Sequence, residues 1–125
     1  MAMTTIEVAN RLVELVKAQK EVQAMDELYH AEIVSNEPAG ETRETTGIEM
    51  CKNKAKWFND MFENHGVEIL GPYPNDDKFA IHYNYDLTAK EGGHRFNMTE
   101  VALYQVKDGK IVWEKFYYDP SLMGG

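Results

Sequence analysis

A glutamate followed by proline ends the apolar run "IVSN" at residues 33–36, and it is the first candidate for chemistry in this chain. Glu37 could be a solvated carboxylate at the end of a strand, or an acid at the mouth of a pocket that moves protons. Proton transfer would require burial, because a glutamate with its ordinary pKa of ~4.3 is a weak base at neutral pH. The residues around Glu37 leave both interpretations open.

Glu100 and Glu114 lie in segments where apolar and polar residues alternate. Alternation places Glu100 on the same strand face as Ala102 and Tyr104, and it groups Glu114 with Phe116 and Tyr118. Acids on an inward face are costly unless they are hydrogen-bonded, so either they line a wet pocket or this assignment of faces is wrong. The same faces carry tyrosines that either pack in the core or orient a ligand, namely Tyr83, Tyr85, Tyr104 and Tyr118.

Metal, cofactor and thiol chemistry find little support. His30 and Glu32 share a strand face, but no His or Cys pair has a recognised zinc spacing, so no metal is expected. The segment "GETRET" lacks the glycine spacing of a phosphate-binding loop, and no cofactor is expected. Cys51 falls on the apolar stripe of a predicted helix without a base fixed beside it, which favours a buried thiol over a nucleophile.

Composition narrows the class of protein. The 125 residues fit one domain, 1–125, and 43% of them are hydrophobic. The net charge of -8 argues against nucleic acid as a partner, and no apolar run is long enough for a membrane span. The start "MAMTTIEVANRL" lacks the pattern of a secretory signal and Cys51 is the only cysteine, so a cytoplasmic location is expected.

Three helices are predicted in the first half of the chain. Thr4 and Glu7 have the spacing of a capping box, and apolar residues then recur at helical spacing at Ile6, Ala9, Leu12, Val13 and Val16. A second helix is predicted from Glu21 to Leu28. Thr46 and Glu49 repeat the capping-box spacing before a third apolar stripe, and this helix is predicted to end near Gly66; the stripe comprises Ile48, Cys51, Ala55, Phe58 and Phe62.

Strand patterns occupy the rest. "YHAEIVSN" is predicted to be extended up to Pro38, "AGETRET" a loop, "VEILGPY" a short strand and "PNDD" a turn. Residues 78–88 alternate strictly, and "KEGGH" is predicted to be a hairpin loop before "RFNMTEVALYQV". The next strand, "KIVWEKFYYD", follows Asp108-Gly109, a pair suited to a tight turn. Helices on one antiparallel sheet make an α+β domain, and long, bent strands would leave a concave interior for a ligand.

The order of these elements resembles the SnoaL-like branch of the nuclear transport factor two-like superfamily, which includes ketosteroid isomerase and limonene epoxide hydrolase. The pieces "YHAEIVSNEPAG", "DKFAIHYNYDLTA" and "EVALYQVKDGKIVWEKFYYD" carry the likeness, which covers almost the whole chain. The resemblance implies a cone-shaped, cystatin-like α+β barrel, with the three helices in the concave face of a curved, mainly antiparallel sheet. It also implies a homodimer through the outer face of the sheet, and a pocket for a small, mostly apolar or polyketide-like molecule.

The resemblance also suggests roles for single residues. Glu37 falls where ketosteroid isomerases place their catalytic aspartate. The tyrosine of their oxyanion hole corresponds to Leu12, and the protonated acid corresponds to Ala102 or Glu100. Limonene epoxide hydrolases use an Arg-x-Asp pair on a middle strand and an aspartate on the last strand, and neither is present here. The middle strand offers His82 and Asn84, or Ile81 and Tyr83, and the last-strand position is Phe116.

Two functions follow as hypotheses. The chain is either a cofactor-free isomerase or polyketide cyclase with Glu37 and Glu100 as catalytic residues, or a non-catalytic ligand-binding or dimeric interaction domain. The predicted ligand-binding residues are Leu12, Ile33, Ser35, Phe58, Phe62, Ile81, Tyr83, Tyr85, Ala102, Tyr104, Glu114, Phe116 and Tyr118.

Overall fold

The computed structural model describes residues 2–40 and 43–123. Its helices α1 (Thr5–Lys17) and α2 (Glu21–Leu28) lie where the sequence predicts them. The capping box is confirmed: Oγ1 of Thr4 accepts from the backbone N–H of Glu7, whose carboxylate accepts from the N–H of Thr4. Ile6 is 40% exposed, however, and Val8 and Leu15 join the buried stripe of α1 in its place.

Both predicted ends of the third helix are wrong. Helix α3 (Ile48–Met61) is preceded by Gly47 at a φ of 104°, without a side-chain cap. Thr46 cannot cap it because this residue pairs with Val34 in a sheet, and the N–H of Gly47 donates to the carbonyl of Ile33. At the other end, Phe62 already has extended backbone and pairs with Ala89, so the helix stops before Gly66.

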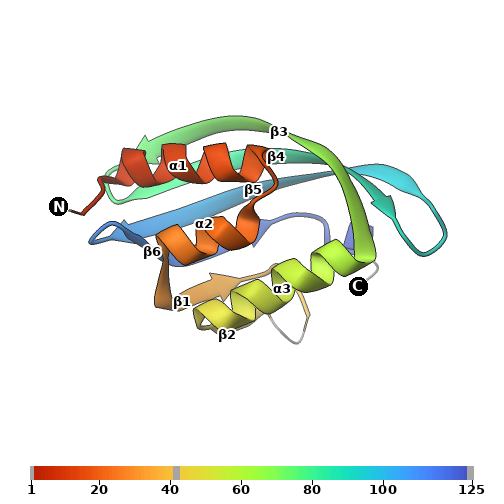
Figure 1. The fold of residues 1–125 in the computed structure, drawn as a ribbon, viewed down its shortest axis with the longest axis horizontal. Coiled ribbons are helices and arrows are strands. Elements are labelled where there is room, and N and C mark those ends of the chain that lie inside the picture. The colour runs from red at the N-terminus through yellow and green to blue at the C-terminus, as the bar shows by residue number, and fades with distance from the viewer. Residues whose placement is uncertain (1, 41–42, 124–125) are drawn as a thin grey trace.

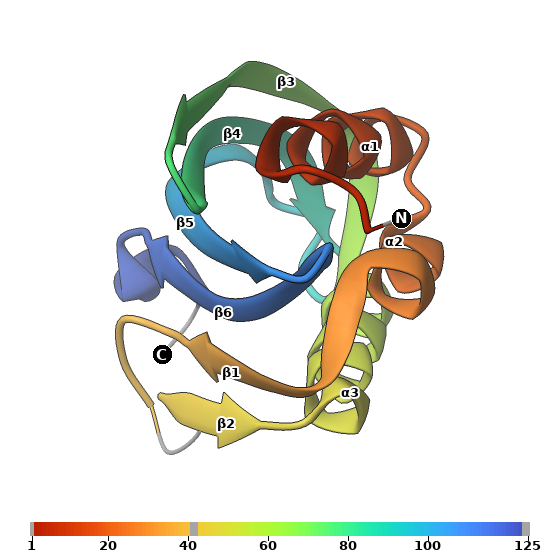
Figure 2. The same cartoon turned by 90° about the vertical axis from the view of Figure 1, so that its left-hand side faces the viewer.

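Six strands form one sheet in the order β2-β1-β6-β5-β4-β3 within the described residues. Their bounds are β1 (Tyr29–Asn36), β2 (Glu44–Thr46), β3 (Phe62–Asn75), β4 (Lys78–Ala89), β5 (Arg95–Lys107) and β6 (Lys110–Tyr117). Figure 2 shows the strands as an arc that curves around one side of the molecule and does not close, with the three helices along its concave side. The long strands run side by side behind α1 and α2 in Figure 1. The predicted α+β class is confirmed.

The sheet is mainly antiparallel, as predicted, and one segment differs from the prediction. Among the described strand pairs only β1 and β6 are parallel. Glu44 and Thr45, predicted to be in a loop, belong to the short strand β2, which pairs with β1 in antiparallel fashion. The edge of β1 offers free backbone hydrogen-bonding groups, and pairing there outweighs the polar composition of this segment.

The hairpins β3–β4 and β5–β6 set the faces of the sheet. β3 is longer than the predicted segment at both ends, and the turn is limited to Asp76 and Asp77. Asp108 and Gly109 both have positive φ, 51° and 77°, as a tight two-residue turn requires. In β5 every second residue from Met98 to Val106 is buried, so Glu100 does face inward. No helix in the described ranges is both long and apolar enough to cross a membrane.

Candidate functional site

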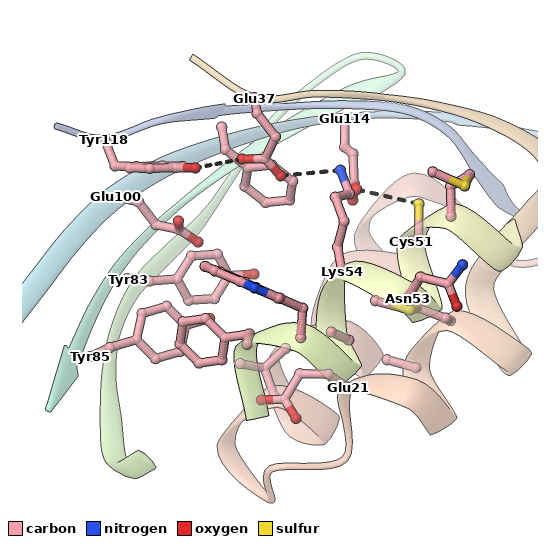
Figure 3. Close-up of a pocket in the computed structure, with 18 of the residues that line it drawn as sticks. Glu21, Glu37, Cys51, Asn53, Lys54, Tyr83, Tyr85, Glu100, Glu114 and Tyr118 are labelled. Carbon is pink, nitrogen blue, oxygen red and sulfur yellow. Dashed lines mark hydrogen bonds and ion pairs between the residues drawn. The ribbon is translucent and has the colours of Figure 1, made fainter. Parts of the chain in front are cut away.

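A cavity of about 740 Å³ lies between the concave face of the sheet and the helices (Figure 3). All three helices contribute to its wall, together with β4, β5, β6 and the segment after β1. Ten of the residues predicted to form the site line this cavity: Leu12, Glu37, Phe58, Tyr83, Tyr85, Glu100, Tyr104, Glu114, Phe116 and Tyr118. Most of the wall is apolar or aromatic, and a few carboxyl groups point into it.

Glu37 is held on both of its oxygens. Oε1 accepts a hydrogen bond from Nζ of Lys54 at 3.1 Å, and Oε2 accepts one from the hydroxyl of Tyr118 at 2.9 Å. The Glu37 side chain is 17% exposed and that of Lys54 is 23% exposed, so the ion pair is partly shielded from water. Glu37 is therefore neither a free surface carboxylate nor a fully buried one.

Lys54 connects Glu37 to a second acid. The side chain reaches the cavity from α3, and Nζ also donates to Oγ of Ser35 at 2.8 Å. Ser35 in turn donates to Oε2 of Glu114 at 2.7 Å. Residues from β1, α3 and β6 thus form one continuous network that runs along the wall of the cavity.

Glu114 is almost completely buried, with 2% of its surface exposed. Its carboxylate accepts from the hydroxyls of Tyr29 and Ser35, and Sγ of Cys51 lies 3.9 Å from Oε2. Burial raises the pKa of Glu114, while the hydrogen bonds from Tyr29 and Ser35 and the charge of Lys54 act in the opposite direction. The predicted face of β6 is right, and hydrogen bonds offset the cost of burying this acid.

Glu100 has a different environment. It is 9% exposed and points into the cavity, with Glu37 and Tyr118 on one side and Tyr83 and Tyr85 on the other (Figure 3). Its carboxyl group makes no hydrogen bond with any described residue. Burial, and then the charges of Glu37 and Glu114, raise the pKa of Glu100 to about 8. At neutral pH this side chain is mostly a neutral acid that can donate a hydrogen bond into the cavity.

The tyrosines form a wall beside Glu100. The hydroxyls of Tyr83 and Tyr104 are 2.8 Å apart, and the ring of Tyr85 stacks on that of Tyr83 at 5.6 Å between centroids. Burial raises the pKa of Tyr83, Tyr85 and Tyr104 well above the ordinary value, so these hydroxyls stay neutral. Burial also raises the pKa of the Cys51 thiol to about 11, which makes it a poor nucleophile.

The described residues contain no group of three His, Cys, Asp or Glu side chains that could hold a metal ion. The lining of the cavity itself provides carboxyl groups, hydroxyls and one ammonium group. Among these groups, Glu100 is a neutral acid, Glu37 is an ion-paired carboxylate, and Glu114 is fully engaged in the wall.

A sequence model described as the SnoaL-like domain matches residues 3–118. The chain belongs to the SnoaL-like family. Its match with a solved structure from Mesorhizobium loti, provisionally named a SnoaL-like polyketide cyclase, has 38% identity and a TM-score of 0.86, and covers 93% of this chain and 100% of that one. A search of curated proteins gives no match.

More distant structures share the SnoaL-like fold. An NTF2-like protein of unknown function from Cytophaga hutchinsonii is 17% identical with a TM-score of 0.70, over 100% of this chain and 98% of that one. A protein with a ketosteroid isomerase-like fold from Catenulispora acidiphila, solved in complex with trimethylamine, is 21% identical with a TM-score of 0.75, over 93% and 88% of the two chains. At these identities the likeness establishes the fold alone.

Five residues predicted to bind a ligand lie outside the lining of the cavity. Ile33, Ile81 and Ala102 are completely buried in the main core, where they belong to one cluster with residues of all three helices. Phe62 belongs to a second core cluster with Leu87 and Met98. Ser35 is also fully buried, but it reaches the site indirectly through its hydrogen bonds to Lys54 and Glu114.

The sequence interpretation missed Lys54, Tyr29 and Glu21, which also line the cavity of this SnoaL-like protein. A signal for Lys54 was present. It lies three residues after Cys51 and four before Phe58, so it shares the inward face of α3 with both. A helical stripe defined by apolar residues alone does not include a lysine that lies on the same face.

Proposed function

We propose that this SnoaL-like protein is a cofactor-free isomerase or cyclase that moves a proton at a carbon next to a carbonyl group. Glu37 is the base, and neutral Glu100 donates a hydrogen bond to the oxygen on which negative charge develops. The substrate is a small, mostly apolar molecule that fits the cavity, of the polyketide-like kind.

The observation that carries this proposal is the contrast between two acids on one cavity. The carboxyl group of Glu37 accepts a hydrogen bond from an ammonium group on one oxygen and from a hydroxyl on the other. Glu100 has no such partner, and its pKa of about 8 keeps it protonated at neutral pH. One acid ion-paired with a lysine and one acid kept protonated by burial can supply a base and a hydrogen-bond donor in the same space.

The proposed step balances without an external reactant. Glu37 takes a proton from the carbon, the C–H bond breaks, and its electron pair becomes the enolate. Glu100 stabilises the enolate oxygen by a hydrogen bond. The reaction ends in one of two ways. As in an isomerase, Glu37 returns the proton to another carbon. As in a cyclase, the enolate carbon attacks a carbonyl of the same molecule, a C–C bond forms, and the resulting alkoxide takes the proton back from Glu37.

The relative from Mesorhizobium loti supports the substrate class, since it is 38% identical and bears the name of a polyketide cyclase. Tyr83, Tyr85, Phe58 and Phe116 give the cavity aromatic walls suited to a flat, partly conjugated molecule. A homodimer remains a prediction from the resemblance. A row of residues on the outer face, Leu70, His82, Val101 and Tyr117, includes three exposed apolar or aromatic side chains where a second copy would pack.

The alternative function is ligand binding without catalysis. It is favoured by one specific observation: both oxygens of Glu37 are already occupied, by Lys54 and by Tyr118. A base must turn one oxygen toward the substrate, so one of these contacts has to loosen in a productive complex. A binding domain would need no such change.

The deciding experiment follows hydrogen–deuterium exchange at the α-carbons of 2-tetralone, an enolisable bicyclic ketone, by proton NMR in D2O. We expect the protein to accelerate exchange and Glu37→Gln to abolish the acceleration. The matched control is Glu91→Gln, because Glu91 is exposed in the loop between β4 and β5. Equal acceleration by the wild-type and Glu37→Gln proteins would overturn the proposal and leave the binding domain.

A further inference from the structure

We propose that Lys54 is a positioning and charge-compensating residue of the site. Its ammonium group pairs with the Glu37 carboxylate before proton transfer and stabilises the negative charge of the enolate after it. This inference rests on the proposed function, because it describes what happens to the ion pair when Glu37 accepts a proton. It concerns a residue that the resemblance to isomerases does not assign.

The first support is the position of the ammonium group. Nζ of Lys54 lies 3.1 Å from Oε1 of Glu37 and 2.8 Å from Oγ of Ser35, and the side chain lines the cavity (Figure 3). Lys54 is also the only basic side chain among the described residues that line the cavity. Among the described lining residues, no other cation is available to a negative charge that develops on a bound substrate.

The second support is the charge balance of the step. Before the reaction the Glu37–Lys54 pair is neutral. When Glu37 takes a proton its charge disappears, and the pair becomes positive by one unit at the moment the substrate becomes negative by one unit. Proton transfer moves the negative charge from Glu37 to the substrate, and Lys54, which lines the cavity beside Glu37, can compensate that charge in both places.

The third support is an anchor for Lys54 that does not depend on Glu37. Ser35 accepts from Lys54 and donates to Glu114, which also accepts from Tyr29. All three of these partners are at least nine-tenths buried, and so they keep their places when Glu37 is neutralised. This role gives a reason for the buried Glu114. Because the Ser35 hydroxyl donates its hydrogen to Glu114, the Ser35 oxygen is free to accept from Lys54, and the ammonium group stays beside the cavity.

The test uses 2-naphthol, whose anion resembles the enolate of 2-tetralone, and measures both its affinity and its ionisation by UV absorbance. Glu37→Gln carries a neutral amide and so imitates Glu37 after proton transfer, with Lys54 unpaired. We expect this variant to bind 2-naphthol as the anion, roughly 10- to 100-fold more tightly than the wild type. Adding Lys54→Met in the Glu37→Gln background should erase that gain, and Lys54→Arg should keep most of it.

The matched control is Lys56→Met, because Lys56 is an exposed residue of the same helix outside the cavity lining. Thermal unfolding of each variant checks that the fold is retained. If Lys54→Met and Lys56→Met have the same effect on 2-naphthol, the inference about Lys54 is wrong. Failure of every variant to bind 2-naphthol also counts against it, since a cavity of about 740 Å³ has room for this molecule.

Exchange of 2-tetralone separates this inference from the proposed function. If Glu37→Gln loses exchange and Lys54→Met does not, Glu37 is supported as the base and the proposed role of Lys54 is wrong. If both variants lose exchange and Lys54→Arg recovers it, the roles of Glu37 and Lys54 are both supported. Unchanged exchange in Glu37→Gln would reject the proposed function, whereas the 2-naphthol affinities would still report on the charge of Lys54.

Discussion

Replacing Glu100 by glutamine should change how the stability of the protein depends on pH. In the folded protein the pKa of Glu100 is about 8, raised from 4.5 mainly by burial. Between these two values the folded state holds a proton that the unfolded chain has lost. Folding stability therefore falls as pH rises through this window, and it falls no further above pH 8.

The size of the effect follows from the two pKa values. Each pH unit between 4.5 and about 8 lowers the free energy of unfolding by ~1.36 kcal/mol, which amounts to roughly 5 kcal/mol across the whole window. Between pH 5 and pH 8 the expected loss is roughly 3 kcal/mol. Glutamine has nearly the same shape as glutamate and does not titrate. In Glu100→Gln the free energy of unfolding therefore lacks this dependence on pH.

The assay is urea unfolding of the wild-type and Glu100→Gln proteins at pH 5, 6, 7 and 8. The difference in free energy of unfolding, variant minus wild type, should rise with pH by up to ~1.4 kcal/mol per unit. A constant offset from the buried amide does not affect this slope, and acids that do not interact with Glu100 cancel in the difference. Glu91→Gln should give a flat difference. A flat difference for Glu100→Gln as well would show that Glu100 is charged in the folded protein, and would refute the donor role.

Two further predictions concern the wall of the cavity. Glu114→Ala should lower the free energy of unfolding, measured in urea, by roughly 2–4 kcal/mol, because it leaves the hydroxyls of Tyr29 and Ser35 buried without an acceptor. Glu114→Gln keeps an acceptor oxygen and should lower the free energy of unfolding by less. Equal losses in the two variants would contradict this account. Ala55 lies on the part of α3 that lines the cavity, so Ala55→Phe should fill space and weaken 2-naphthol binding at least roughly tenfold. Thermal unfolding should stay cooperative in this variant. An unaltered affinity would mean that 2-naphthol binds elsewhere.

Local patterns predicted the fold well where a single segment determines its own structure. The capping box at Thr4, the alternation in β4 and the Asp108-Gly109 turn each depend on neighbours in sequence, and each is confirmed. The errors lie where pairing with a segment distant in sequence determines the backbone conformation. Phe62 has helical spacing from Phe58, but its backbone pairs with Ala89 at the far end of β4.

The site was less predictable, because it depends on which inward residues the helices cover. Alternation alone puts Ala102 and Glu100 on the same face, yet Ala102 is sealed in the core and Glu100 points into the cavity. The ion pair between Glu37 and Lys54 joins the end of β1 to the middle of α3, and no spacing rule connects two such positions. The alternation in the strands predicted which side chains face inward, Glu100 and Glu114 among them, but not which of these reach the cavity.

The number of partners distinguishes the acids of this cavity. Glu114 is buried more deeply than Glu100, but its oxygens accept hydrogen bonds from two hydroxyls. Its role in holding the cavity wall together is enough to explain its presence. Glu100 has no hydrogen-bond partner within the described chain, and a leucine or methionine in its place would pack the same face at lower cost. A group that weakens the fold and points into an open cavity is better explained by what it does there than by folding. For the same reason, Glu100 should gain a partner only when a molecule with a hydrogen-bond acceptor enters the cavity.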